Sequence, residues 1–397
     1  MVATETVNQA RALDRLISAQ ATEITVSVPE EQHREVLFGG PGVQRALERL
    51  TSALSDRVDG AVLASFENQL YKVATALDMY RRLDLSMYSG VLVATQHSPI
   101  IRALFVAATE QRVPVVYVPH APVAANSAYL DLPVDYAGLR GEGEREFYHR
   151  ELGIELTDLG IVGNLASDLL TRPVPELNLN TAGVLALSPH QPHVLEQIFR
   201  IVAEADCGDM IVAPHPRSDL DAIRDLLPPS WSMFEGERTL DLLAAGPPFL
   251  FQFSSGVAWE SAALGIPTAT IHIDDSPVNY PFLADESIYP PIRTTDETQR
   301  FVSFARSGTY DRTQMRTHAE QWCAVDGDQA VAQLQELLET VSPHSSPNRL
   351  HDGWAKDGVA LSRSWIASTA VAPESAHQSA QTFDSSSPSS ENKGTLV

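Results

Sequence analysis

Apolar residues in the first half of the chain fall into short β-rich runs separated by segments with helical spacing. Residues 6–20 carry apolar side chains on one helical face, and residues 24–28 alternate as a strand does. From Ser89 onward the pattern is strand, helix, strand, which is typical of a βαβ unit. The expected strands are 90–94, 113–118, 134–139 and 160–163, and the expected helices are 100–108 and 142–152.

A second series of the same kind begins near Gly183 and ends with an amphipathic helix over 328–340. Two such series in tandem predict two Rossmann-like α/β domains that face each other. We expect the domains to span 1–172 and 181–341, with the junction in Pro173–Asn180. The expected strands are 184–187, 210–213, 249–253 and 268–273, and the further helices are 194–203, 220–227, 240–245 and 258–264.

The composition changes after Val341, where Ser, Pro, Ala and Asn dominate. Such a composition predicts a disordered C-terminal tail over 342–397. Trp354 and Trp365 stand out in it, either as a short docking segment or as incidental aromatics. A peripheral membrane contact or a partner-protein contact through this tail is compatible with the sequence.

The charge balance narrows the classes of partner. The chain has 51 acidic and 28 basic residues, for a formal charge of −23. This excess argues against broad nucleic-acid binding and against docking of the whole surface on anionic lipid. It still allows a local basic groove for a phosphorylated ligand.

The two cysteines, Cys207 and Cys323, form neither a disulfide framework nor a zinc site. The first ten residues lack the features of a signal peptide, and every long uncharged run is interrupted. We therefore expect no transmembrane segment and a cytoplasmic protein, free or at the inner face of the membrane.

Ligands of open parallel sheets bind beyond the carboxyl ends of the strands, so the residues after each strand are the first to inspect. In the second half, Ser254-Ser255-Gly256 follows one strand and precedes a helix that carries Glu260. Hydroxyls and backbone N–H groups at a helix start favour a phosphate, and Glu260 can accept ribose hydroxyls. The structural alternative is a serine N-cap with Glu260 as a helix-dipole partner.

Two further motifs follow strands of the same half. His215-Pro-Arg217 offers a histidine and a bidentate guanidinium to a base or phosphate, and Ser188-Pro-His190 ends the first strand of the series. The alternative for each histidine is a cap on a strand end. Because the three motifs occur in order, we predict one nucleotide site that contains Ser188, His190, His215 and Arg217 together with the serine turn.

In the first half, His120 ends a buried strand and is the predicted general base or substrate ligand, since histidine titrates near neutral pH. Glu142, after the next strand, is a second predicted base, with a solvated helix start as its alternative. Gly163 and Asn164 are expected to form a tight turn near the crossing between domains, before a helix at Ser167. The sequence holds no phosphate-binding glycine-rich motif and no cluster with metal-ligand spacing, so no metal and no cofactor are expected.

At these residues the chain resembles GT-B glycosyltransferases of bacterial surface polymers, over roughly residues 85–340. That group includes capsule polysaccharide transferases, polysialyltransferases and teichoic-acid glycerophosphotransferases. The matching segments are Pro119-His120, Asp135-Tyr-Ala-Gly-Leu-Arg-Gly-Glu142 with Tyr148, Ile161-Val-Gly-Asn164, Pro214-His-Pro-Arg217, Ser254-Ser-Gly-Val-Ala-Trp-Glu260 and Leu264-Gly-Ile-Pro267. Pro119-His120-Ala121 departs from the Gln-His-Gly that such families often show, and no acidic pair clearly matches the one that supplies the base in polysialyltransferases.

The resemblance implies that His215 contacts the nucleotide of a CMP-, CDP- or UDP-linked donor and that Ser254 and Ser255 contact its phosphate. It also implies transfer of a sugar, or of a polyol phosphate, to a hydroxyl of a surface polysaccharide or glycopolymer. Because no metal-ligand cluster is found, we expect this transfer to be metal-independent.

Two alternatives stay open. The chain also resembles non-hydrolysing UDP-N-acetylglucosamine 2-epimerases, which share the fold, through Gln32-His-Arg-Glu35. Its Ser-Ser-Gly turn differs from their Ser-Gly-Gly, and it lacks their acidic-glycine-arginine segment. The other alternative is a catalytically silent GT-B module that binds a nucleotide or a partner transferase.

Overall fold

Two six-stranded parallel sheets organise the chain. The computed structural model describes residues 1–20, 23–25, 41–55, 57–126, 129–236, 238–273 and 279–341, and all structural statements concern those residues. The first sheet has the strand order β2-β1-β3-β4-β5-β6, and every neighbouring pair is parallel. Its strands are β1 (Val2–Thr4), β2 (Glu23–Thr25), β3 (Val91–Val93), β4 (Val115–Tyr117), β5 (Tyr136–Leu139) and β6 (Leu159–Ile161).

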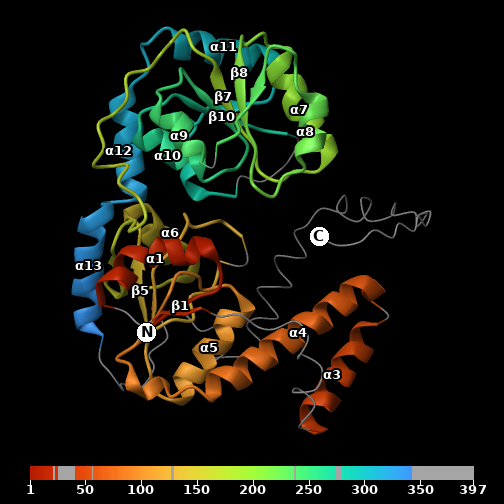
Figure 1. Cartoon of the computed structure of the whole chain (residues 1–397), viewed down its shortest axis with the longest axis vertical. Helices are drawn as coiled ribbons and strands as arrows, with labels where there is room; N and C mark the ends of the chain where they lie inside the picture. The colour runs from red at the N-terminus through yellow and green to blue at the C-terminus, as the bar shows by residue number, and fades with distance from the viewer. Residues whose placement is uncertain are drawn as a thin grey trace, which may run out of the picture. The chain divides into compact units, whose positions relative to one another are not determined.

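Helices cover both faces of the first sheet, because successive residues of a buried parallel strand point to opposite sides. Val91 and Val93 join the core beneath α4, α5 and α6, whereas Leu92 joins the core beneath α1. Figure 1 shows α4 and α5 packed side by side. The helices of this first lobe are α1 (Val7–Gln20), α3 (Pro41–Leu54), α4 (Gly60–Arg81), α5 (Pro99–Glu110) and α6 (Glu142–Leu152), with 3-10 turns at Leu85–Met87 and Leu156–Asp158.

The second sheet has the order β12-β11-β10-β7-β8-β9, again with parallel pairs only. The order of the chain reverses between β7 and β10. In open α/β sheets the crevice beyond the carboxyl ends of two such strands is the usual ligand site. The strands are β7 (Gly183–Ala186), β8 (Met210–Ala213), β9 (Ser232–Met233), β10 (Leu250–Gln252), β11 (Thr268–Ile271) and β12 (Pro291–Ile292).

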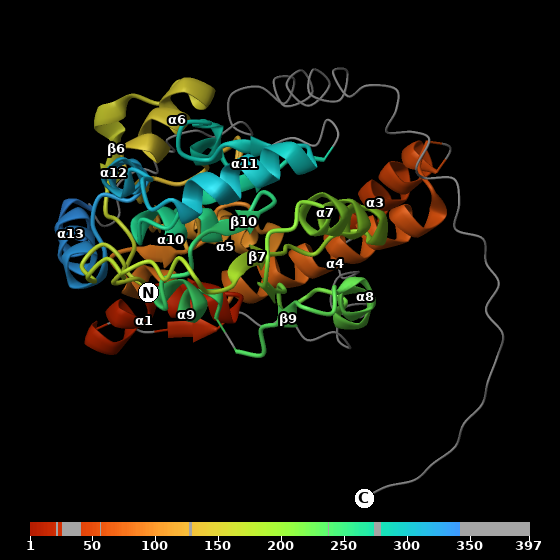
Figure 2. The ribbon, with the colours of Figure 1, turned by 90° about the horizontal axis from the view of Figure 1, so that it is seen from above.

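This second lobe also has a core on each face of its sheet. Leu185 and Phe251 pack with α7 and α11, which lie next to each other (Figure 2), whereas Val184 and Leu250 pack with α9, α10 and α12. Both lobes belong to the same compact unit of the chain. The helices are α7 (Pro192–Ala203), α8 (Leu220–Leu226), α9 (Thr239–Ala244), α10 (Val257–Ala263), α11 (Thr295–Arg306) and α12 (Arg312–Trp322), with a 3-10 turn at Pro281–Ala284.

The last described helix, α13 (Gly327–Thr340), was expected in the second domain but packs on the first sheet. Its buried residues Ala330 and Leu334 share a core with Val2, Leu92 and Val116. The amphipathic pattern predicted the helix correctly, but an apolar stripe can be buried by either sheet. The chain therefore crosses between the lobes twice, once after β6 and once before α13.

Most expected elements are present with boundaries shifted by a few residues. The helix expected at Ser167 is wrong: the segment forms turns, because the Leu169 N–H donates to the Ser167 hydroxyl (3.1 Å) and the Leu170 N–H to an Asp326 carboxylate oxygen (2.7 Å). The expected tail 342–397, with Trp354 and Trp365, lies outside the described residues. So do residues 26–28 of the expected second strand, and Gln32–Glu35.

Candidate functional site

The serine turn, Ser254-Ser255-Gly256, lies at the point where the strand order of the second sheet reverses. It follows β10, and Gly256 is the residue before α10. Ser254 has a φ of 41°, in the left-handed region that non-glycine residues seldom occupy. The Ser255 N–H donates to the buried Gln252 side chain (2.7 Å), which in turn donates to Thr270 (2.7 Å). The strand below thus fixes the turn and its two hydroxyls.

Glu260 lies in the first turn of α10, beyond the serine turn. Burial raises the pKa of its carboxyl to about 7, although the charges of Arg238 and Arg140 oppose the rise. A carboxyl in this state can donate or accept a hydrogen bond near neutral pH. That property suits contact with a hydroxylated ligand.

His215 and Arg217 form a turn of their own after β8. The His215 Nδ1 atom accepts from the Arg217 N–H (3.1 Å), and the Ser218 N–H donates to the His215 carbonyl (2.8 Å). This bond makes Nε2 the protonated nitrogen of the neutral ring. Burial and the charge of Arg217 lower the pKa of His215. The turn therefore offers an N–H donor from His215 and an exposed guanidinium from Arg217.

Ser188 and His190 follow β7, the other strand at the reversal point. The His190 ring packs edge-on against Phe253 at 4.8 Å between ring centres. Its Nε2 atom is buried and has no hydrogen-bond partner among the described residues, and burial lowers its pKa. Ser188 is half-buried. The structure thus brings His190 next to the end of β10 and its serine turn.

His120 has a hydrogen bond that fixes which ring nitrogen carries the proton. Its Nδ1 atom lies 2.6 Å from the Ala94 carbonyl oxygen, which can only accept, so Nδ1 carries the hydrogen. In the neutral ring Nε2 is then the acceptor. Burial, helped by the charge of Arg140, lowers the pKa of His120 and favours this neutral form.

The loop after His120 contacts the serine turn of the second lobe. A Cβ added at Gly256 would lie 3.8 Å from the Pro122 ring. The Ala125 N–H donates to the Asn279 carbonyl (2.5 Å), and the Asn279 N–H donates to the Ser254 hydroxyl (3.0 Å). These contacts connect the histidine of the first lobe with the predicted phosphate turn of the second.

Solved structures with this arrangement are known. A Listeria monocytogenes protein named as a candidate UDP-N-acetylglucosamine 2-epimerase matches with a TM-score of 0.56 at 14% identity, over 88% of this chain and 98% of its own. The UDP-GlcNAc 2-epimerase of Neisseria meningitidis, solved with UDP-GlcNAc bound, has a TM-score of 0.53 at 14% identity, with 85% and 99% covered. The calicheamicin glycosyltransferase CalG4 has a TM-score of 0.50 at 14% identity, with 86% and 91% covered. The chain has the GT-B fold.

The GT-B fold expected from the sequence is therefore confirmed. No protein-family model and no curated protein matches the chain. At sequence identities near 14%, the similarity to these structures supports a shared fold and no shared activity. A shared fold does not determine an activity, which depends on the residues of the site.

The second predicted base, Glu142, lies on the surface of the GT-B first lobe. Its carboxylate forms an ion pair with Arg145 (2.7 Å) on the same helix, a contact that fits the alternative of a solvated helix start. The buried carboxylate of α6 is Glu144, which is 1% exposed and accepts from the Val123 and Arg140 backbone N–H groups (3.0 Å each). Its role is to hold the loop that follows His120.

Gly163 and Asn164 form the tight turn expected near the crossing. Gly163 has a φ of 93°, and a Cβ there would lie 2.2 Å from the Val325 carbonyl oxygen. The Asn164 N–H donates to that same carbonyl (3.0 Å), and the Gly327 N–H donates to the Asn164 carbonyl (3.1 Å). The turn thus attaches the start of α13 to the first GT-B lobe.

Sequence reasoning missed two polar groups at the carboxyl edge of the first sheet. Thr95, Gln96 and His97 follow β3, and the His97 ring packs against Tyr129, tilted by 43°, at 4.9 Å between ring centres. Arg140 follows β5 and is 3% exposed. The signal was available, because each group directly follows a predicted strand.

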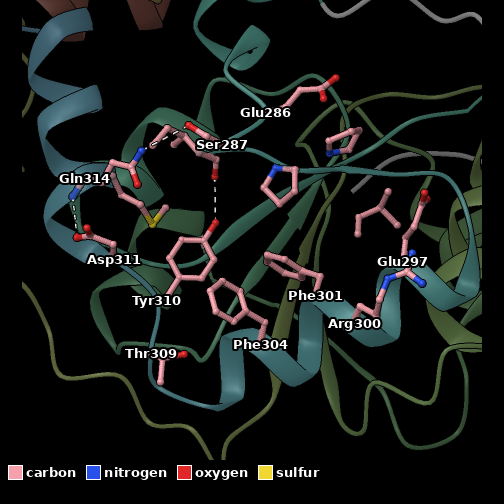
Figure 3. Close-up of a pocket in the computed structure, with 15 residues that line it drawn as sticks. Glu286, Ser287, Glu297, Arg300, Phe301, Phe304, Thr309, Tyr310, Asp311 and Gln314 are labelled. Atoms are coloured by element: carbon pink, nitrogen blue, oxygen red, sulfur yellow. Dashed lines mark hydrogen bonds between the residues drawn. The ribbon is translucent and has the colours of Figure 1, made fainter.

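Elsewhere in the GT-B chain, a cavity of about 530 Å³ lies beside the edge strand β12 (Figure 3). Phe301, Phe304 and Tyr310 face it, with Arg300 and Glu297 at its margin, and its lining includes none of the predicted site residues. Among the described residues, no group of three or more His, Cys, Asp and Glu side chains is arranged to hold a metal ion. Within the same residues, no helix has the length and apolar character needed to cross a membrane.

Proposed function

We propose that this GT-B chain transfers a glycosyl group, or a polyol phosphate, from a nucleotide-activated donor to an acceptor hydroxyl. The observation that carries the proposal is His120, whose ring is held with Nε2 unprotonated beside a loop that contacts the serine turn. In this assignment residues 1–172 bind the acceptor and the second lobe, from residue 181, binds the donor.

The proposed step uses His120 as general base. Nε2 takes the proton of the acceptor hydroxyl as its oxygen attacks the transferred carbon, or the phosphorus of a polyol-phosphate donor. The bond from that atom to the nucleotide phosphate oxygen breaks, and its electron pair leaves with the nucleotide. Ser254, Ser255 and the N–H of His215 then donate to the developing negative charge, and Arg217 adds a positive one.

The experiment replaces His120 by alanine and measures turnover and nucleotide affinity separately. Removing a general base lowers turnover by about 10²–10⁴-fold and leaves nucleotide affinity nearly unchanged. His149→Ala is the matched control, because the His149 Nδ1 atom also donates to a backbone carbonyl, that of Ile154 (2.7 Å), at the far end of α6. Full turnover in His120→Ala would refute His120 as the general base. Loss of activity in EDTA would refute a metal-independent transfer.

A 2-epimerase is the second candidate, because the solved structures similar in fold include the Neisseria enzyme with UDP-GlcNAc bound. Incubation with UDP-GlcNAc alone, followed by NMR of the sugar C2 proton, separates the candidates. An epimerase converts the sugar without an acceptor, and a transferase turns over only when an acceptor hydroxyl is added. Binding with neither reaction would support the silent module.

We further propose that the donor is CMP-, CDP- or UDP-linked and that the acceptor is a bacterial surface polysaccharide or glycopolymer. Both statements rest on the order of the His-Pro and Ser-Ser motifs, which resembles that of the surface-polymer transferases. A thermal-shift panel of CMP, CDP, UDP, GDP and TDP tests the nucleotide, since a ligand that binds only the folded state raises the melting temperature.

A further inference from the structure

Arg140 is a buried guanidinium that lies between the two lobes. It directly follows β5, and its backbone is fixed on both sides: the N–H donates to Glu144 (3.0 Å) and the carbonyl accepts from Ala324 (2.9 Å). Its guanidinium carbon lies 4.4 Å from the centre of the Trp259 ring, on α10 of the second lobe. The side chain thus belongs to the first lobe and rests against the second.

Within the part of the chain that the structure describes, the guanidinium of Arg140 has no ion-pair partner. Among the described residues, no carboxylate oxygen lies within ion-pair distance of the guanidinium, and its Nε atom is buried with no hydrogen-bond partner. The neighbouring Cys323 thiol is uncharged, since burial raises its pKa to about 11, although the charge of Arg140 and a hydrogen bond with its side chain oppose the rise. A buried arginine keeps its proton, so this cation is held without a direct ion pair, although its charge also acts on the buried carboxyl of Glu144.

The surroundings of Arg140 place it next to the predicted site. Trp259 is three residues beyond Gly256, whose position faces Pro122 in the loop after His120. The charge of Arg140 also acts on Glu260 and His120: it opposes the rise in the pKa of Glu260 that burial causes, and it adds to the lowering of the pKa of His120. The guanidinium is therefore close to both the base and the first turn of α10.

We propose that Arg140 binds the diphosphate group of the donor, as the first-lobe half of an anion site whose other half is Ser254 and Ser255. A guanidinium forms two parallel hydrogen bonds with a phosphate group, and it does so more strongly where water is excluded. The proposal rests on the proposed function, because it assumes a donor with a diphosphate. It differs from a purely structural role for Arg140, which would need no ligand.

The test uses inorganic pyrophosphate and isothermal titration calorimetry on the full chain. Arg140→Met keeps the length of the side chain and removes the charge, and we expect it to weaken pyrophosphate binding tenfold or more. Arg140→Lys keeps the charge but cannot form the two parallel hydrogen bonds of a guanidinium, and we expect a smaller loss of pyrophosphate affinity. Arg312→Met is the matched control, because the hydrogen bonds that the Arg312 guanidinium forms with described residues all go to backbone carbonyls, those of Gly265, Pro175 and Leu264. The control should lower the melting temperature without changing pyrophosphate affinity.

Unchanged affinity in Arg140→Met, or no pyrophosphate binding by the wild-type chain, would overturn the proposal. If Arg140→Met does not fold, Arg140→Lys provides the test. Equal pyrophosphate affinity in the lysine variant and the wild type would reject paired hydrogen bonds from Arg140 to the diphosphate. Pyrophosphate carries no sugar, so its binding tests the anion site at Arg140 independently of the proposed transferase activity. Binding that depends on Arg140 in a protein without turnover would keep the anion site and reject the transferase.

Discussion

Replacing Glu260 by glutamine should change how the stability of the protein depends on pH. Burial raises the pKa of this carboxyl to about 7 from its ordinary value of 4.5, against the opposing charges of Arg238 and Arg140. Between these two values the folded chain binds a proton that the unfolded chain has released. Unfolding then releases this proton, so the free energy of unfolding falls as pH rises.

The two pKa values give the size of the effect. Their difference corresponds to about 3 kcal/mol of stability, fully present below pH 4.5 and lost by the time the pH exceeds 7. Most of it, about 2 kcal/mol, is lost between about pH 5.5 and about pH 8. Glutamine keeps the shape of the protonated carboxyl and cannot ionise. Relative to wild type, Glu260→Gln should therefore gain about 2 kcal/mol over this interval.

Urea unfolding followed by tryptophan fluorescence at several pH values measures this difference, since Trp259 is buried beside Glu260. Glu297→Gln provides a control of opposite sign. Hydrogen bonds from the backbone N–H groups of Arg293 and Thr294 lower the pKa of Glu297, so its contribution is present at neutral pH and lost as pH falls. Parallel stability curves for wild type and Glu260→Gln would refute the reasoning.

Three further variants test other parts of the structure. Ser255→Ala should weaken nucleotide binding about tenfold, because one hydrogen bond to a charged phosphate is lost; calorimetry that gives equal affinities would reject this contact. Gly163→Ala should destabilise the protein by more than about 1–2 kcal/mol, since a Cβ would collide with the Val325 carbonyl at a φ of 93°. Leu334→Ala should cost about 2–5 kcal/mol, because this side chain is fully buried. Hydrogen exchange should then increase in the first lobe, and an increase confined to the second lobe would contradict the packing of α13.

The sequence predicted helices and strands well where local residues alone mark the start and the end of the element. The helix over 142–152 was predicted at its true boundaries, since acidic residues begin it and Gly153 ends it in the left-handed conformation. Elements as short as β12, with two residues, carry too little pattern to be predicted. The partner of α13 is a tertiary property, which no local pattern records.

The sequence could indicate those candidate site residues that directly follow predicted strands. His120 and the serine turn follow buried strands, and their loops are in contact. The sequence-based prediction named Glu142 and did not consider Glu144. Both lie in the first turn of the same helix, and burial, which the sequence does not record, distinguishes them. The position of Arg140 after a predicted strand could have indicated it, but its contact with Trp259, more than a hundred residues away in the sequence, is a tertiary property.

The return of α13 to the first sheet has a consequence for folding on the ribosome. Val2, Leu92 and Val116 share their core with Leu334, so this core stays incomplete until the chain has been synthesised beyond that residue. The whole second lobe emerges in between. At roughly 5–20 residues per second, this takes on the order of ten seconds or more, during which an apolar surface of the nascent first lobe is uncovered. The second lobe can fold first, and the earlier part of the chain is completed last.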